Sequence, residues 1–256
     1  MSLILYHGEP NGPSLTVLAA LHESGREADL VPIDLAAGER HNKAPQARLV
    51  EMSIEGEGPV LVADGEPVAD SVFIAQYLDE SGAGTLQPTE AYARWEMEMW
   101  CRFVIERVAP AAALLGNRAH LTPKLQAMGD DAFEGLIGRI ASADLAQRWG
   151  KERAGDYPEA QLVDSRTKIA QAVDKLEKRL DGDWILGAFT IADLETYAWL
   201  AGMVTIVPEA FENAPKTRAW LERVKVRPSV QKALAQARSN DPLEAWAPGP
   251  EINRWG

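Results

Sequence analysis

The chain has 256 residues, 46% of them hydrophobic and 25% charged, a composition typical of a globular protein with one large or two modest domains. Its formal net charge of −12 opposes a phosphate backbone and no Lys/Arg-rich run reverses this locally, so we expect no nucleic-acid partner. A single cysteine, Cys101, excludes an internal disulfide framework, and the lack of a signal-peptide pattern or a long apolar run predicts a cytoplasmic protein with no membrane span.

The first third of the chain alternates short β-type runs with helix-period segments. The third run ends at Asp64-Gly65, a dipeptide that favours a hairpin, so the last two strands should be antiparallel neighbours. A further helix should open at Asp70-Ser71. The predicted strands cover residues 3–6, 30–33, 60–63 and 66–68, and an earlier helix covers residues 14–23.

After residue 88 almost every long segment has helical period. The Gly- and Pro-containing stretch before it is a predicted linker, which gives two domains, residues 1–82 and residues 88–256. Thr190 and Asp193 form a predicted capping box at the start of one helix. Two other predicted helices cover residues 90–115, with Trp95, Met99, Phe103 and Val104 on one face, and residues 166–180, with a core-facing stripe of Ile169, Val173, Leu176 and Leu180.

Three separate pieces of the N-terminal half carry candidate chemistry. The first is the loop over residues 6–14, which ends in Ser14 at the start of the first helix. A hydroxyl and backbone N–H groups at a helix N-terminus favour an anion such as a thiolate. Taken alone, Ser14 also fits a plain capping role.

The other two pieces are a strand start and a helix start. Pro59 opens the third strand, where a cis X-Pro bond would turn the preceding backbone outward to pair with a peptide ligand. Asp70 could bind an ammonium group and Ser71 a carboxylate, which together match the two charges of an α-amino acid end. An ordinary trans proline and a plain N-cap remain the alternatives for each piece in isolation.

The three pieces together, in this order and spacing, resemble the glutathione transferase superfamily. The stretch over residues 65–78 looks like the signature segment of that family, and the stretch over residues 227–234 is similar to its closing helix. The resemblance covers nearly the whole chain. It implies an α+β thioredoxin-like N-terminal domain followed by an all-α helical C-terminal bundle, which is the glutathione transferase fold.

The resemblance also implies the role of each site residue, with glutathione as cosubstrate and no metal. Ser14 would hydrogen-bond the glutathione sulfur. The backbone of Gly58, before Pro59, would pair with the cysteinyl unit, and Asp70 and Ser71 would hold the γ-glutamyl end. Two further residues belong to the glycyl end: His41, which matches a contact residue of several classes, and Glu57, which stands where the family commonly has Gln or Lys.

Two departures from the family pattern lie in this region. Residues 52–55 replace the usual Asn-Pro, and Glu57-Gly58-Pro59 replaces Gln-Val-Pro or Lys-Val-Pro. Glu57 would set like charge against the glycyl carboxylate unless it points away, so the exchange should weaken glutathione binding. Gly58 has more backbone freedom than Val, so holding the cis-proline turn at this position costs more conformational entropy.

Within the superfamily, the segment over residues 145–158 and the opening residues 3–6 with Ser14-Leu15 resemble the bacterial β-etherases. In that chemistry the glutathione thiolate displaces a phenol from a lignin-derived β-aryl ether α-ketone. The helical domain would supply a pocket for the aromatic substrate. Its candidate residues are Trp100, Phe103, Trp149, Trp199 and the tail tryptophans, although aromatic residues at helical spacing belong more often to a core. Arg148 and Arg153 either face an anion or belong to a solvated helix face.

Three readings of function stay open at this point: an active β-etherase, a non-catalytic or weakly active subunit of a heterodimeric β-etherase, and a general detoxifying glutathione transferase. Family members pair as two-fold dimers, so we expect a homo- or heterodimer. The tail over residues 241–256 either covers the active site or is loosely ordered.

Overall fold

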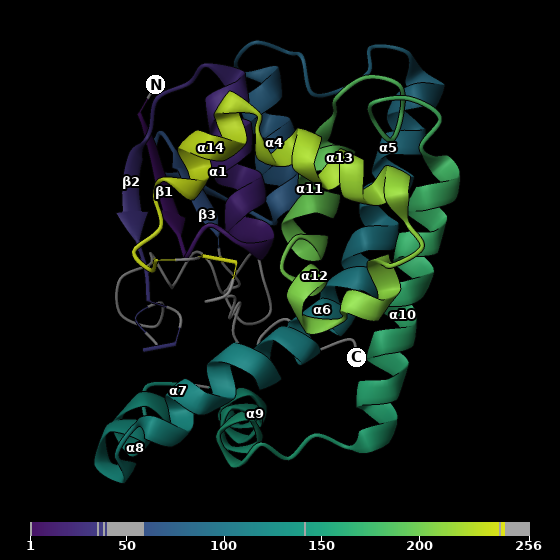
Figure 1. The fold of residues 1–256 in the computed structure, drawn as a ribbon. Helices are drawn as coiled ribbons and strands as arrows, with labels where there is room; N and C mark the ends of the chain where they lie inside the picture. The colour runs from purple at the N-terminus through teal and green to yellow at the C-terminus, as the bar shows by residue number, and fades with distance from the viewer. Residues whose placement is uncertain are drawn as a thin grey trace.

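A computed structural model describes residues 2–34, 36–37, 39, 59–140, 142–240 and 242–243 of the chain. Its N-terminal part is built on a sheet of strand order β2-β1-β3-β4 (Figure 1). Strand β2 is parallel to β1, whereas β3 is antiparallel to both β1 and β4, as the sequence predicts for the last two strands. The strands are β1 (Leu3–His7), β2 (Asp29–Pro32), β3 (Val60–Ala63) and β4 (Glu66–Ala69).

Two helices of this part pack on each other and on the sheet. Helix α1 (Gly12–Ser24) buries Val17 and Leu18 completely, and α4 (Ser71–Glu80) does the same with Ile74 and Leu78. The predicted hairpin turn between β3 and β4 is confirmed. Both of its residues have positive φ, +48° at Asp64 and +89° at Gly65, which is the backbone that an Asp-Gly dipeptide tolerates.

A helical run extends from residue 91 to residue 127, well beyond the predicted end at residue 115. Its predicted apolar face is wrong in part, because Trp95 is 50% and Met99 42% exposed. Met97, Trp100 and Cys101 are buried instead. Apolar residues occur on all sides of this helix, so their spacing alone does not decide which face is buried. The run consists of α5 (Ala91–Phe103), the π-helical turn η1 (Val104–Val108), α6 (Ala109–Gly116), a second π-helical turn η2 (Asn117–Leu121) and α7 (Thr122–Ala127).

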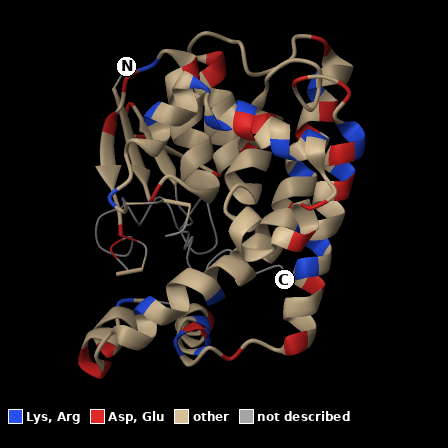
Figure 2. Ribbon diagram, viewed as in Figure 1, with Lys and Arg blue, Asp and Glu red and all other residues tan. Residues whose placement is uncertain are grey.

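The longest of the remaining helices is α10 (Glu159–Arg179), and its predicted stripe from Ile169 to Leu180 is buried as expected. Figure 2 shows acidic and basic residues along its length, and two i,i+4 ion pairs stand on its surface. The other elements are α8 (Asp130–Ile137), α9 (Ala143–Ala154), α11 (Ile191–Leu200), α12 (Met203–Ile206), the 3₁₀ turn η3 (Pro208–Phe211), α13 (Pro215–Lys225) and α14 (Pro228–Leu234).

Helix α11 is the centre of the helical part, and all of its residues are buried. The predicted capping box is confirmed, with the Thr190 N–H donating to Asp193 Oδ2 at 3.0 Å. Asp193 Oδ1 also accepts from the Trp220 indole at 2.9 Å and from the Ile185 N–H at 3.1 Å. Burial raises the pKa of the Asp193 carboxyl to about 6, although these donors oppose the shift.

The two parts of the chain share a hydrophobic core, in which α1 packs against α11 and α14. The predicted linker between them is held in place by Asp79. Its Oδ1 accepts from the Thr85 and Leu86 N–H groups at 2.7 and 2.8 Å, and Leu86 is buried. The domain boundaries themselves stay a prediction. Among the helices of the described residues, none is both long and apolar enough to cross a membrane.

Candidate functional site

The strand register brings the three candidate pieces to one edge of the sheet. Tyr6 near the end of β1 pairs with Val60 at the start of β3, and Val60 pairs with Ala69 at the end of β4. The segment that follows β1, the residue that precedes β3 and the residue that follows β4 therefore lie side by side. These are the loop that leads to Ser14, then Pro59, then Asp70.

Ser14 lies in the first turn of α1 and is only 5% exposed. Its Oγ accepts a hydrogen bond from the Gly8 N–H at 2.9 Å. Because this contact uses a lone pair, the hydroxyl hydrogen remains available to donate to a ligand atom. Gly12 opens the helix with φ +47°, a left-handed conformation that glycine adopts without strain. The arrangement fits a hydroxyl that donates to an anion at a helix N-terminus.

The chain after α14 contacts the loop between β1 and α1, and the sequence alone did not predict this contact. The Arg238 guanidinium pairs with the Glu9 carboxylate at 3.2 Å and donates to the Ile33 carbonyl at 2.9 Å. The Asn11 side-chain amide donates to the Pro242 carbonyl at 2.9 Å. Arg238 and Pro242 therefore tie the loop between β1 and α1 to the C-terminal part of the chain, and Arg238 also ties it to the end of β2. Glu9 and Arg238 are more than two hundred residues apart in the sequence, so no local pattern predicts their contact.

Asp70 caps α4 from a strained position, with φ +76° at a non-glycine residue. Its Oδ1 accepts from the Val72 N–H at 2.9 Å and from the Phe73 N–H at 3.4 Å, so both of these hydrogen bonds use one carboxylate oxygen. Desolvation raises the pKa of the Asp70 carboxyl, whereas these two N–H groups lower it. The residue as a whole is exposed, so water near the carboxylate screens these effects. Ser71, the first residue of α4, is buried beside it.

Pro59 is buried at the entrance to β3, in the place that the resemblance predicts. Its backbone partner Gly58 lies outside the described residues. The same holds for His41 and Glu57, and for the departure over residues 52–55. Their predicted roles at the cysteinyl and glycyl ends of glutathione stay predictions. Of the predicted site residues, the structure describes Ser14, Pro59, Asp70 and Ser71.

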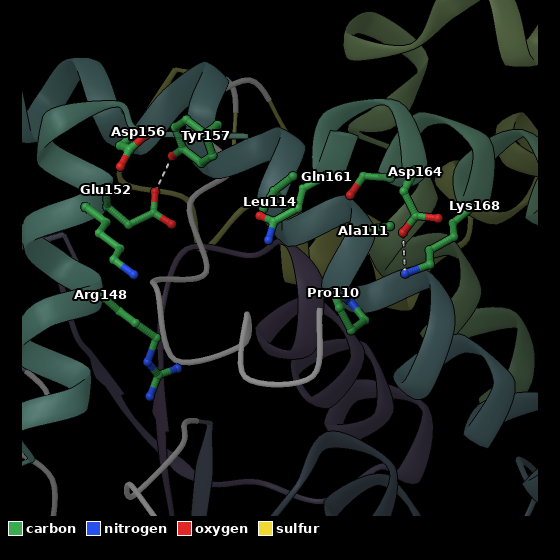
Figure 3. Close-up of a pocket in the computed structure, with 12 residues that line it drawn as sticks. Pro110, Ala111, Leu114, Arg148, Glu152, Asp156, Tyr157, Gln161, Asp164 and Lys168 are labelled. Atoms are coloured by element: carbon green, nitrogen blue, oxygen red, sulfur yellow. Dashed lines mark hydrogen bonds and ion pairs between the residues drawn. The ribbon is translucent and has the colours of Figure 1, made fainter. Parts of the chain in front are cut away.

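A cavity of about 260 Å³ opens between α6, α9 and α10 (Figure 3). Arg148 and Glu152 extend from α9 on one side, and Asp164 with Lys168 stands on α10 across from them. The α8–α9 region reaches the same edge of the sheet as Ser14, because the Arg139 guanidinium donates to the Ala37 carbonyl just after β2 at 3.1 Å.

The cavity wall combines polar and apolar groups and includes the phenol of Tyr157, whose hydroxyl contacts Glu152 and, at 2.8 Å, Thr122 Oγ1. Burial, followed by the Glu152 charge, raises the pKa of the Tyr157 phenol far above its ordinary value. A buried phenol of this kind stays protonated at neutral pH. Figure 3 shows the contact with Glu152 at the side of the cavity.

The prediction of a tryptophan-lined pocket is wrong for two of its candidates. Trp149 and Trp199 are almost fully buried in the core. Trp100 and Phe103 border a shallow depression together with Trp95 on the outer face, and the tail tryptophans lie outside the described residues. Of the two candidate arginines, Arg148 lines the cavity.

Arg153 has a structural role instead. Its guanidinium pairs with Asp130 at 2.7 Å and lies 4.6 Å above the Phe133 ring centroid. These contacts fasten α9 to α8. The prediction that Arg153 faces an anionic ligand is not supported by these contacts.

Fold and site together define the class of protein. A sequence model for the N-terminal domain of glutathione S-transferases matches residues 1–80, and one for their C-terminal domain matches residues 129–223. The two matches cover more than half of the chain, which belongs to the glutathione S-transferase family. This confirms the predicted family and the predicted fold of a thioredoxin-like domain followed by a helical one.

The chain is also similar to individual members of the family over most of its length. The chain is 28% identical over 258 residues to protein LigF of Sphingobium sp. strain SYK-6, which covers 95% of this chain and 97% of LigF. The crystal structure of the β-etherase LigF from that strain matches with a TM-score of 0.82 at 26% identity, over 93% of this chain and 100% of LigF. A glutathione S-transferase of Silene vulgaris is 27% identical over 243 residues, which cover 91% of this chain and 97% of that protein.

Proposed function

We propose that the protein is a glutathione transferase of the β-etherase type. The observation that carries the proposal is the meeting of Ser14, Pro59, Asp70 and Ser71 at one sheet edge, in a chain that matches LigF over almost its whole length. The β-etherase LigF is a relative of moderate identity, so its activity supports the substrate class as a proposal.

Glutathione would bind along this edge with its γ-glutamyl end at α4 and its sulfur at α1. The ligand ammonium lies opposite Asp70 Oδ2, and its carboxylate takes the Ser71 N–H and hydroxyl. The Ser14 hydroxyl donates to the sulfur. A free thiol has a pKa of about 8.5, and each unit of depression needs about 1.4 kcal/mol of preferential thiolate stabilisation. One hydroxyl and a helix N-terminus supply about that much.

The thiolate then attacks the carbon next to the aryl ketone of a β-aryl ether. A carbon–sulfur bond forms, the carbon–oxygen ether bond breaks, and the bonding pair leaves on the phenoxide. The phenoxide takes a proton from water and departs as the phenol, and the other product is a glutathione thioether. Ser14 acts on the thiolate alone in this step.

The cavity between α6, α9 and α10 is our candidate for the aromatic acceptor. Arg139, between α8 and α9, contacts the chain after β2, and Arg148 of α9 brings a cation to the cavity wall. A phenoxide leaving group gains from a cation of this kind, since negative charge develops on its oxygen as the ether bond breaks. The predicted roles of Trp149 and Trp199 in this pocket are not part of the proposal.

A dimer is the form in which we propose that the protein acts. Phe73 at the start of α4 and Tyr92, Trp95 and Met99 on α5 are all exposed. Gln76 bonds to Glu98 at 3.4 Å, so the two helices present one face. Exposed apolar side chains gathered in this way are typical of an interface. Their presence supports the expected dimer and leaves open whether the partner is identical.

The experiment compares two substrates with the purified chain and glutathione. We expect release of guaiacol from a model β-aryl ether ketone, at a rate well above conjugation of a simple aryl halide. Comparable rates on both would support a general detoxifying transferase. Glutathione binding without turnover of either substrate would support the non-catalytic subunit of a heterodimer.

A further inference from the structure

Glu195 is a carboxylic acid with no exposed surface, in the middle of the core helix α11. Its Oε1 accepts from the Trp199 indole N–H at 2.8 Å. Its Oε2 is buried and has no hydrogen-bond partner among the described residues. An apolar side chain would fill this place at lower cost, because a buried acceptor without a donor is unfavourable. The structure therefore keeps an acid here at the expense of stability.

The carboxyl faces the N-terminal domain at the glutamyl end of the proposed site. The Thr16 hydroxyl of α1 and the Ser71 hydroxyl of α4 both lower its pKa, so both lie close to it. Thr16 Oγ1 is itself buried without a partner. The Thr16 and Ser71 hydroxyls are thus the groups of the N-terminal domain that can hydrogen-bond the Glu195 carboxyl. Ser71 is the residue proposed to hold the ligand carboxylate.

The charged surroundings of Glu195 are acidic. Burial is the main cause that raises the pKa of the Glu195 carboxyl, and the charge of Asp70 at the start of α4 adds to it, to a value of about 7. Cys101 on α5 has a pKa raised well above its ordinary value and stays neutral. Asp193 on the same helix is bound by Trp220, Ile185 and Thr190. From α1 the facing group is Thr16, which does not titrate.

We propose that Glu195 is a positioning residue for the γ-glutamyl carboxylate of glutathione, acting through Ser71. In its protonated form the acid donates to Ser71 Oγ, and the Ser71 hydroxyl hydrogen is then free to donate to the ligand carboxylate. The proposal rests on the proposed glutathione site and adds to it a residue from the helical domain.

Loss of the proton reverses this chain of hydrogen bonds. A Glu195 carboxylate accepts from Ser71 and so withdraws the hydroxyl hydrogen from the ligand. It also places a second negative charge behind the ligand carboxylate. Affinity for the glutamyl end therefore falls as pH rises through neutrality. Thiol ionisation has the opposite effect, since a higher pH favours the reactive thiolate.

The test is calorimetry of the full chain with S-methylglutathione, which carries the same γ-glutamyl end but no ionisable thiol. Loss of one charge-assisted hydrogen bond predicts about tenfold weaker binding near pH 8.5 than near pH 6 for the unchanged chain. In Glu195→Gln the amide donates to Ser71 at every pH, so its affinity should stay at the low-pH value. Glu106→Gln, an exposed carboxylate paired with Arg102 on the neighbouring helical run, should follow the unchanged chain.

A second readout is the uptake of a proton on binding. Proton uptake on binding makes the measured enthalpy depend on the ionisation enthalpy of the buffer, and we expect that dependence near neutral pH in the unchanged chain and none in Glu195→Gln. Binding without proton uptake and with a flat pH profile would overturn the role of Glu195 and leave the glutathione site standing. A folded Glu195→Gln chain that binds nothing would also overturn it. Failure of the unchanged chain to bind at any pH would refute the glutathione site itself.

Discussion

Replacing Ser14 by alanine removes the hydrogen bond that the proposed mechanism depends on. A hydrogen bond to a charged group contributes about 1.5–3 kcal/mol, so the pKa of bound glutathione should rise by about one to two units. At neutral pH the thiolate fraction, and with it kcat/KM for a β-aryl ether ketone, should fall about 10- to 100-fold. The affinity for S-methylglutathione should change little, because it has no thiolate.

The assay is a pH titration of the thiolate ultraviolet absorbance of bound glutathione, together with guaiacol release. Ser14 Oγ also accepts from the Gly8 N–H, so Ser14→Ala leaves a buried donor unpaired and should lower the free energy of unfolding by about 1–3 kcal/mol. Urea unfolding measures that loss separately. Ser14→Thr keeps the hydroxyl and serves as the matched control. If the folded Ser14→Ala chain leaves the thiol pKa unchanged, our reasoning about the sulfur contact is wrong.

Four further outcomes follow from the same contacts. Arg238→Gln releases the loop before Ser14 and should lower kcat/KM about threefold, the effect of a partly exposed ion pair, and an unchanged rate would show that the loop holds without it. The pKa of Glu195 in the folded chain is about 7, above its ordinary 4.5, so its contribution to stability is complete below about pH 4.5 and is lost as pH rises to about 7. Urea unfolding of the unchanged chain should show that the free energy of unfolding falls by on the order of 3 kcal/mol over this range. The same measurement on Glu195→Gln should give a flatter profile. Trp95→Glu places a charge in the exposed apolar face, so light scattering should show a shift from dimer to monomer, whereas the same mass for both chains would remove this face from the interface. Arg148→Met should lower kcat for the β-aryl ether about tenfold with KM for glutathione unchanged, and an unchanged kcat would remove Arg148 from the stabilisation of the leaving phenoxide.

Much of the fold could be predicted from the sequence because its signals are local. The Asp64-Gly65 turn, the Asp70 cap and the Thr190–Asp193 capping box each depend on residues a few positions apart. The buried stripe of α10 follows from a regular period. The buried face of α5 does not follow from such a period, because apolar residues occur all around that helix and only the neighbouring elements decide which of them are covered.

The candidate site likewise contains residues that the sequence indicated and contacts that it did not. Ser14, Pro59, Asp70 and Ser71 were recognisable by order and spacing, and the strand register explains why these residues meet. The ion pair of Glu9 with Arg238 and the closeness of Glu195 to Ser71 both join residues that are far apart in the sequence. Nothing in the local pattern of α11 distinguishes a buried acid from a solvated one. The tryptophans could not be assigned to a pocket or a core from the sequence, because large aromatic side chains are abundant in both.

The most direct test of the central claim is a crystal structure of the chain with glutathione. The account predicts the γ-glutamyl end between Asp70 and Ser71, the cysteinyl unit beside Pro59, and the sulfur within hydrogen-bond distance of Ser14 Oγ, at about 3.5 Å or less. Glutathione bound elsewhere, or bound here with its sulfur turned away from Ser14, would contradict the assignment of this edge as the site of thiolate activation.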